Sequence, residues 1–344
     1  MFEPALKKAL GIALILSLVG CSAATTPESS SPNSVEQDVT QPGIGQEPKG
    51  YPQVTLDNLE PLAVRELAFT QVRMALLASK PAPDLVNHVF TTNVNMTAAN
   101  NAIEEIPLMA GFFSDVATVS DYTIIWTGKN GSPEVPKIAC EEADFCENLP
   151  IEQYCSMGEL VNLWVACQFN NKDENVFRMP VFHGYTHLVQ SMVAPNAHMP
   201  SWFSEGPAQY FESHFAALHY FGSGYSKSAV DTPSILMMMM KNQDLVRFGK
   251  PATRKNVMDA MLAMENRMPR DGWEQAQLGY YLGYLATEVL IATSGLEKFN
   301  EFWRQTSEKD FYEAFEQEYG LTTKQFYKKF VPYALAWIEI ERLD

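Results

Sequence analysis

Apolar residues follow helical spacing near the start of the folded sequence and strand spacing further along. Between residues 61 and 79 the apolar positions fall on one helix face, and they are Leu62, Val64, Leu67, Ala68 and Val72. Proline follows at Pro81 and Pro83, which predicts an amphipathic helix that ends before them. Residues 121–127 and 161–169 are rich in β-branched and aromatic residues, and they predict two strands. Residues 170–173 read as a turn, and beyond residue 230 the pattern is helical.

Two further helices are expected in the middle of the chain. The first carries two histidines and should end near Ser191, and a loop through Pro195 and Pro200 follows it. The second should start at Ser204, because a serine hydroxyl caps a helix well and the next residue, Glu205, suits the positive end of the helix dipole.

The first residues resemble a bacterial lipoprotein signal peptide. A basic start with Lys7 and Lys8 precedes an apolar run from residue 9 to 19, which is too short to span a membrane. The run ends before Cys21, where a lipid-modified cysteine belongs, although a plain secretory signal or a membrane anchor is the alternative. The resemblance implies cleavage before Cys21, its acylation, and a place in the cell envelope. Ser22 favours the outer membrane, facing the periplasm.

Composition suggests how the rest is divided. Residues 21–50 are rich in Ser, Thr, Pro, Gln and Glu, and they read as a disordered tether after the signal peptide of residues 1–20. We expect an N-terminal α+β subdomain over 51–200 and a helical C-terminal subdomain over 201–344. The net charge of −16 makes nucleic acid a poor partner.

Four cysteines remain once Cys21 carries lipid. They lie close together before the histidine helix, at Cys140, Cys146, Cys155 and Cys167. In an oxidising envelope they predict two disulfides, for which three pairings are open. Free buried thiols are the alternative, and the spacing is not that of a zinc ribbon.

Residues 183–187 read HGYTH, which resembles the zinc-peptidase H-E-x-x-H motif without its glutamate. His183 and His187 stand one helical turn apart, so both rings can reach one metal ion. The position of the proton-accepting glutamate is held by Gly184, which has no side chain. Two structural, hydrogen-bonded histidines on one helix would give the same pair.

A second motif follows, and 17 residues separate His187 from its Glu205. Residues 202–212 read WFSEGPAQYFE and resemble the W-x-x-E-G-x-A-x-Y-x-E signature of the gluzincin metallopeptidases, matching it at Trp202, Glu205, Gly206, Ala208, Tyr210 and Glu212. The resemblance covers about residues 160–335, strongly at the two motifs and loosely elsewhere. It implies a zincin-like α+β fold with a small N-terminal sheet, an active-site helix and a mainly helical C-terminal subdomain.

The resemblance also implies residue roles. His183, His187 and Glu205 would bind Zn²⁺, and two imidazoles with one carboxylate are a known zinc ligand set. Glu212 is either a carboxylate behind a ligand histidine or a solvated surface acid. Residues 161–169 would form an exposed strand that pairs with peptide, or else an ordinary central strand. An oxyanion-stabilising tyrosine would come from the C-terminal half, where Tyr280, Tyr281 and Tyr284 are candidates.

Three functions follow from these features. The first is a zinc-binding pseudopeptidase that binds peptide or an envelope protein. The second is a working zinc metallopeptidase in which Glu212 or a residue distant in sequence replaces the missing base. The third is a lipid-anchored structural protein without metal. We favour the first, because no neighbouring residue in the sequence restores the base.

Overall fold

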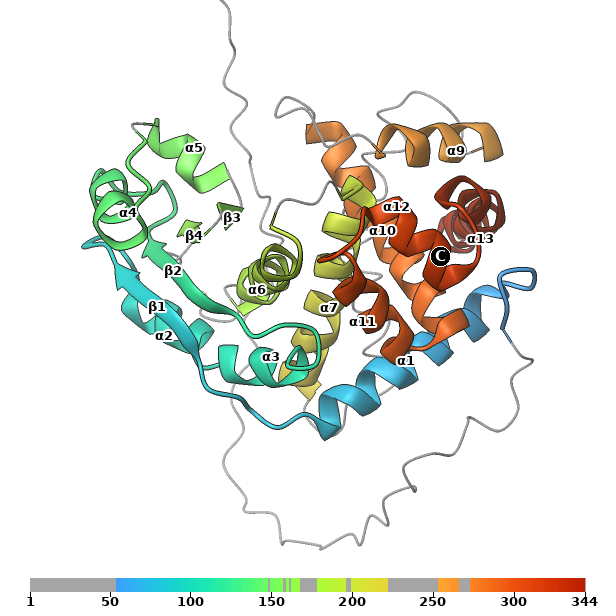
Figure 1. Cartoon of the computed structure of the whole chain (residues 1–344), viewed down its shortest axis with the longest axis horizontal. Helices are drawn as coiled ribbons and strands as arrows, with labels where there is room; N and C mark the ends of the chain where they lie inside the picture. The colour runs from blue at the N-terminus through green and yellow to red at the C-terminus, as the bar shows by residue number, and fades with distance from the viewer. Residues whose placement is uncertain are drawn as a thin grey trace, which may run out of the picture. The chain divides into compact units, whose positions relative to one another are not determined.

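A small, mainly parallel sheet and a larger set of helices make up the folded part of the chain (Figure 1). The computed structural model describes residues 54–147, 149–156, 159–160, 162–167, 178–195, 199–221, 253–265 and 273–343. The predicted signal peptide, Cys21 and the tether lie outside them. The chain divides into Met1–Glu47 and Pro48–Asp344, and everything below concerns the second unit. Its predicted division near residue 200 stays a prediction.

The sheet has the strand order β1-β2-β4-β3. Its strands are β1 (Leu85–Phe90), β2 (Ser120–Thr127), β3 (Glu159–Leu160) and β4 (Leu163–Cys167). The first, second and fourth are parallel, and the two-residue β3 runs antiparallel to β4. This mixed, mostly helical structure agrees with the α+β prediction. Its zincin-like character stays a prediction.

Helices cover both faces of the sheet. In chain order the described helices are α1 (Pro61–Ala78), α2 (Met96–Ile103), α3 (Ile106–Phe112), α4 (Val135–Ala143), α5 (Ile151–Ser156), α6 (Arg178–Val193), α7 (Ser201–Phe221), α9 (Arg254–Ala263), α10 (Trp273–Ser294), α11 (Leu296–Gln305), α12 (Phe311–Tyr319) and α13 (Thr323–Leu343). Side chains alternate between sheet faces, so Trp126 and Trp164 face the main core while Ile125 and Val165 face α4 and α5. This is why β2 and β4 read as continuous apolar runs.

The predicted elements match the structure more closely at their centres than at their ends. The helix predicted over 61–79 is α1, and the predicted strands are β2 and β4, although residues 161, 168 and 169 of the second prediction lie outside the described part of the chain. The predicted helix start at Ser204 is wrong, because α7 begins at Ser201 and the amides of Phe203 and Ser204 bond to the carbonyl of Pro200. In the described residues, no helix has the length and apolar character needed to span a membrane.

Both disulfides are local. Cys140 pairs with Cys146 at the end of α4, and Cys155 of α5 pairs with Cys167 at the end of β4. This resolves the three pairings that the sequence leaves open. The second bridge fixes α5 to the last residue of the strand that packs against α6.

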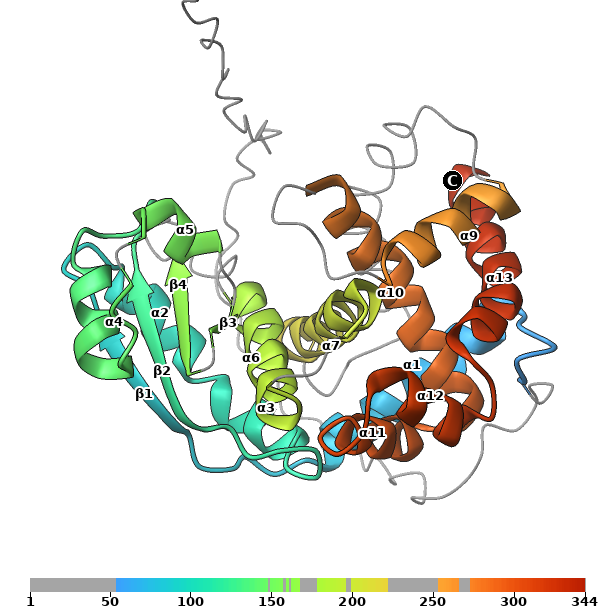
Figure 2. The same ribbon diagram turned by 45° about the horizontal axis from the view of Figure 1, so that its top comes forward.

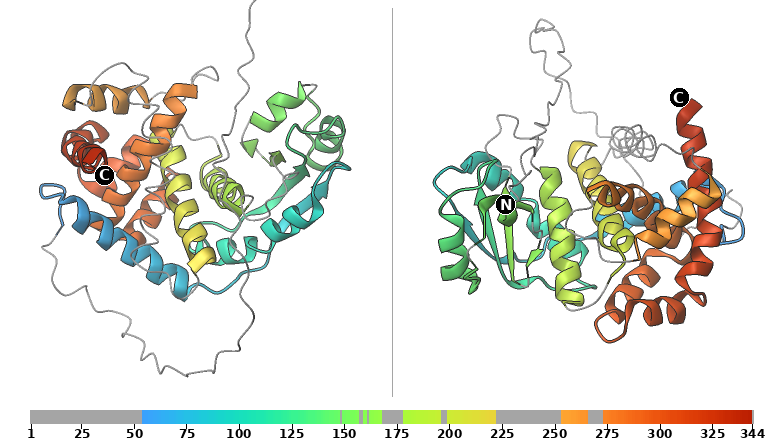
Figure 3. Two further views of the ribbon diagram at one scale, coloured as in Figure 1. Left: turned by 180° about the vertical axis from the view of Figure 1, so that it is seen from behind. Right: turned by 90° about the horizontal axis from the view of Figure 1, so that it is seen from above.

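The two motif helices lie between the sheet and helices α9–α13, as Figures 1 and 2 show. α6 contacts α2 and α3 on the sheet side and α7 on the other, and α7 packs along α10. Two glycines permit this last contact: a Cβ on Gly206 would lie 2.3 Å from the carbonyl carbon of Gly283. Figure 3 shows α1 running beside α7 and α10.

A buried charge network joins α1, α10 and α13. Arg65 Nε donates to Glu288 Oε1 at 2.9 Å, the Tyr333 hydroxyl donates to Glu288 Oε2 at 2.5 Å, and the Arg65 guanidinium lies 3.5 Å from the ring centre of Trp337. If the helices moved apart, one charge would stay buried without its counter-ion, which is strongly unfavourable. The network therefore favours one arrangement of the three helices.

His214 of α7 lies near this network. Its ring packs 4.6 Å from Tyr210 and 5.5 Å from Phe69, measured between ring centres. Burial, and then the positive charge of Arg65, lower the pKa of His214 to about 3. The folded protein therefore holds this imidazole neutral, and it is a core residue.

We expect His214 to make the fold sensitive to acid. Because its folded pKa is depressed, its contribution to stability is present above the unfolded pKa of about 6.5 and is lost as pH falls below it. By pH 5 this loss is about 2 kcal/mol, at 1.4 kcal/mol per pH unit. Urea unfolding of wild type and His214→Phe between pH 5 and 8 measures it, and a phenylalanine variant with the same pH dependence as wild type would contradict the assignment.

Candidate metal centre

The two motif helices bring three ligand-type side chains to one point. His183 and His187 of α6 and Glu205 of α7 each place one nitrogen or oxygen atom within 4.8 Å of the others. Glu205 Oε2 lies 3.4 Å from His183 Nε2 and 3.5 Å from His187 Nε2, and the two Nε2 atoms are 2.9 Å apart. These residues form a group that could hold a metal ion.

A second residue supports each histidine from behind. His183 Nδ1 lies 3.2 Å from Glu212 Oε2, and His187 Nδ1 lies 2.7 Å from Gln190 Oε1. Glu212 is 9% exposed, so it is no solvated surface acid. It stands two helical turns after Glu205 on the same face of α7 and occupies the position predicted for a carboxylate behind a ligand.

When no metal is bound, the hydrogen bonds of His183 and His187 require one proton more than two neutral imidazoles carry. His183 Nδ1 faces a carboxylate, which only accepts, so this nitrogen carries a proton. His187 Nδ1 likewise donates to Gln190, which leaves its Nε2 to accept from His183 Nε2. We assign this extra proton to His183: burial opposes its charge, but contacts with Glu205 and Glu212 outweigh burial and raise its pKa to about 10.

Glu205 is the charged partner of this imidazolium. Burial alone would raise the pKa of its carboxyl, but the interactions with His187 and His183 bring that pKa well below its usual range. Its Oε2 atom is buried and makes no hydrogen bond among the described residues. A buried carboxylate oxygen aimed at two imidazoles is a suitable donor set for a divalent cation, which would replace the shared proton.

Gly184 stands between the histidines, where α6 packs against Trp164 of β4. A Cβ built on Gly184 would lie 2.4 Å from Trp164 Cζ2 and 2.5 Å from Trp164 Cη2, a separation at which atoms clash. The indole ring of Trp164, on β4, thus fills the space into which any side chain at position 184 would extend. A glutamate at position 184 would clash with Trp164 of the neighbouring strand.

The indole of Trp164 is itself held from behind. Its ring packs edge-on against Trp126, with 6.1 Å between ring centres. Trp126 Nε1 donates to His88 Nδ1 at 2.9 Å, so His88 Nε2 carries the proton that it shares with Asp84 Oδ2 at 2.7 Å. Trp164 therefore cannot swing away from Gly184 without disturbing a hydrogen-bonded tryptophan on β2.

The three candidate tyrosines of α10 separate clearly. Tyr280 lies beside the site, with its ring centre 5.5 Å from that of His183. Tyr284 packs against Tyr210 in the core at 4.9 Å, and Tyr281 is only 6% exposed. Of the three, Tyr280 is the one that the structure brings to the histidines.

The strand predicted to pair with peptide has a partner on its outer side. Glu159 and Leu160 of β3 pair with Trp164 and Leu163 of β4. The first half of β4 is thus an interior strand, and the interpretation of residues 161–169 as a wholly exposed strand does not hold there. Residues 168–177 lie outside the described part of the chain.

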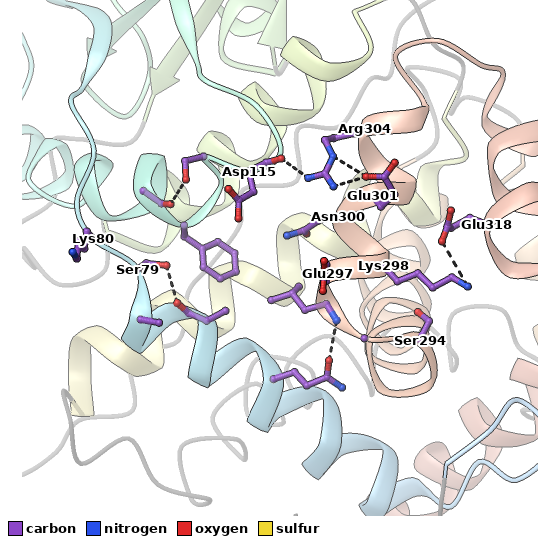
Figure 4. Close-up of a pocket in the computed structure, with 18 residues that line it drawn as sticks. Ser79, Lys80, Asp115, Ser294, Glu297, Lys298, Asn300, Glu301, Arg304 and Glu318 are labelled. Atoms are coloured by element: carbon purple, nitrogen blue, oxygen red, sulfur yellow. Dashed lines mark hydrogen bonds and ion pairs between the residues drawn. The ribbon is translucent and has the colours of Figure 1, made fainter. Parts of the chain in front are cut away.

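A separate hollow of about 1410 Å³ lies among α1, α3 and α11 (Figure 4). None of the three candidate ligands lines it. Two pairs of its charged side chains interact: Arg304 contacts Glu301, and Lys298 lies 3.6 Å from Glu318. The hollow makes no contribution to the candidate metal centre.

Two residues of the site were missed by reasoning from sequence. Gln190 follows His187 by three positions, a spacing that places both on one helix face, so the sequence contained a signal for it. The sequence contained no signal for Trp164, because it reads as one more apolar residue of a strand. Its role depends on how β4 and α6 pack.

Comparisons with models of protein families, with curated proteins and with solved structures find no match to this chain. The local geometry therefore carries the functional argument.

We expect Gly184→Ala to lower the free energy of unfolding. Alanine is normally better than glycine inside a helix by about 1 kcal/mol, but the new methyl meets Trp164, and overpacking of this kind costs about 1–3 kcal/mol. Urea denaturation should show a net loss that shrinks when the same change is made in a Trp164→Leu background.

Gly206→Ala is the matched control, because its methyl would meet the backbone of Gly283 and trimming Trp164 relieves nothing there. Equal effects of Gly184→Ala with and without Trp164 would show that the two positions do not compete for space.

Proposed function

We propose that this protein is a zinc-binding relative of the gluzincin metallopeptidases that binds a peptide or protein segment and has lost efficient hydrolysis. The observation that carries the proposal is the pair of Gly184 and Trp164. The ligands of the metal-binding motif are present and close together, while the space that a base at position 184 would need is filled by an indole ring.

The spacing of the three donor atoms supports zinc. A circle through atoms 2.9, 3.4 and 3.5 Å apart has a radius of about 1.9 Å, close to the distance of about 2.0–2.1 Å at which zinc binds histidine nitrogen. Two imidazoles and one carboxylate also suit zinc better than calcium or magnesium, which prefer oxygen ligands alone. When bound, zinc would act as a Lewis acid at this site.

The contacts of Glu212 argue against its use as a substitute base. Its Oε2 atom is engaged with His183 Nδ1, on the side of the ring opposite Nε2, the nitrogen that faces Glu205. A carboxylate in that position orients the imidazole and strengthens it as a ligand. This favours the pseudopeptidase over a working hydrolase that relies on Glu212.

The proposed setting is the bacterial cell envelope. Residues 1–21 resemble a lipoprotein signal ending at a lipid-modified Cys21, and two disulfides suit an oxidising compartment. We therefore propose a protein anchored by lipid, with the outer membrane as its expected membrane and an envelope peptide or protein as its partner.

Metal content tests the first half of the proposal. We expect about one zinc ion per chain in the purified protein by elemental analysis, and its loss in His183→Ala, because two ligands do not hold zinc as three do. His214→Phe is the matched control, since it removes a histidine of α7 from the core and should leave zinc in place. A wild-type protein without zinc after incubation with the metal would leave only the structural interpretation.

Peptidase activity tests the second half. We expect wild type to be nearly inactive on unstructured peptides, and Gly184→Glu alone to stay inactive because its side chain meets Trp164. Gly184→Glu combined with Trp164→Ala gives the glutamate space, and a general base contributes about 10²–10⁴-fold, so hydrolysis should rise in this double variant. Efficient turnover by wild type that disappears in His183→Ala would overturn the pseudopeptidase proposal.

A further inference from the structure

The side chain of Gln190 contacts both halves of the candidate metal centre. It lies on α6, one helical turn after His187, and is 6% exposed. Its Oε1 atom lies 2.7 Å from His187 Nδ1, while its Nε2 atom donates to the backbone carbonyls of Ser204 at 2.8 Å and Phe203 at 3.2 Å. One carboxamide thus joins a histidine of α6 to the residues just before Glu205.

The two carbonyls fix which way the carboxamide points. A backbone carbonyl accepts and never donates, so the side of Gln190 that faces Phe203 and Ser204 has to be its NH₂ group. Its oxygen must then face His187, where it can only accept. The ring nitrogen opposite it, His187 Nδ1, therefore carries the proton, which leaves the lone pair of His187 on Nε2, the nitrogen that lies beside His183 Nε2 and Glu205 Oε2.

A proline on α7 explains why a carbonyl is available there. In a helix the carbonyl of Phe203 would accept from the amide of residue 207, but residue 207 is Pro207, which has no N–H. The buried carbonyl needs another donor, and Gln190 provides it from the neighbouring helix. The side chain of Gln190 thus replaces the hydrogen bond that Pro207 cannot donate.

We propose that Gln190 is a positioning residue of the metal centre, which selects the metal-binding tautomer of His187 and ties it to the turn of α7 that carries Glu205. This inference rests on the proposed function for its metal. The two histidines then differ in their support: His183 is backed by the charged carboxylate of Glu212, and His187 by a neutral amide that also spans the two helices.

Three variants test this role. Gln190→Met keeps the length of the side chain and loses both kinds of contact. Gln190→Glu keeps an acceptor for His187 but places a carboxylate against two carbonyls, so it should be the less stable protein. Thr186→Val is the matched control, since it removes a buried hydrogen bond from Thr186 Oγ1 to the Phe182 carbonyl on the same helix without touching a ligand.

We expect zinc affinity, measured by competition with a chromogenic chelator, to fall about 10–100-fold in Gln190→Met. Gln190→Glu should retain more affinity than Gln190→Met although it melts at a lower temperature, and Thr186→Val should bind as wild type does. A purely structural role predicts that affinity follows melting temperature across the three variants. That result, or an unchanged affinity in Gln190→Met, would overturn the proposal.

Nitrogen NMR of the metal-free protein separates this inference from the proposed function. In wild type we expect His187 with a proton on Nδ1 and none on Nε2, and loss of this preference in Gln190→Met. A wild-type protein with this tautomer that binds no zinc would contradict the proposed function and leave the role of Gln190 in orienting His187 intact. A proton on Nε2 of His187 in wild type, with Nδ1 bare, would overturn the role itself.

Discussion

The carboxylate of Glu205 is buried beside two imidazoles, so it is removed from water. The packing of α7 against its neighbours holds it there. Burying an unpaired carboxylate is strongly unfavourable, so Glu205 needs the two histidines beside it. Because the histidines lie on α6 and Glu205 on α7, this pairing requires that the two helices stay in contact. On its other side α7 approaches α10 through Gly206 and Gly283, where any larger residue would clash. Close helix packing thus comes before any metal chemistry at this site.

The same constraint explains the glycine inside the histidine motif. α6 is held between α7 and β4, and the indole of Trp164 occupies the remaining space beside Gly184. Because protein interiors are densely packed, a side chain at 184 and this indole exclude one another. A glutamate at position 184 would therefore require changes in two elements, α6 and β4.

The site could be predicted in part, and particular residues show where prediction ended. The histidine pair followed from its spacing and Glu205 from the resemblance to the gluzincin signature, and the structure brings the three side chains together. The helix start at Ser204 was wrong because α7 takes up three more residues before it. Tyr280, Tyr281 and Tyr284 were equivalent in the sequence. Their difference lies in how α10 is turned against α6 and α7, which no local pattern specifies.

The sequence by itself determined the properties that depend on neighbouring residues. These are α1, β2 and the spacing of the histidines, because helical and strand periodicity are local. Tertiary structure alone decided the pairing of the four cysteines, the contact between Trp164 and Gly184, and the carboxamide of Gln190 that joins two helices. Each of these is a contact whose distance is fixed only when the helices, the sheet and the segments between them pack together, although the disulfides join cysteines only 6 and 12 positions apart.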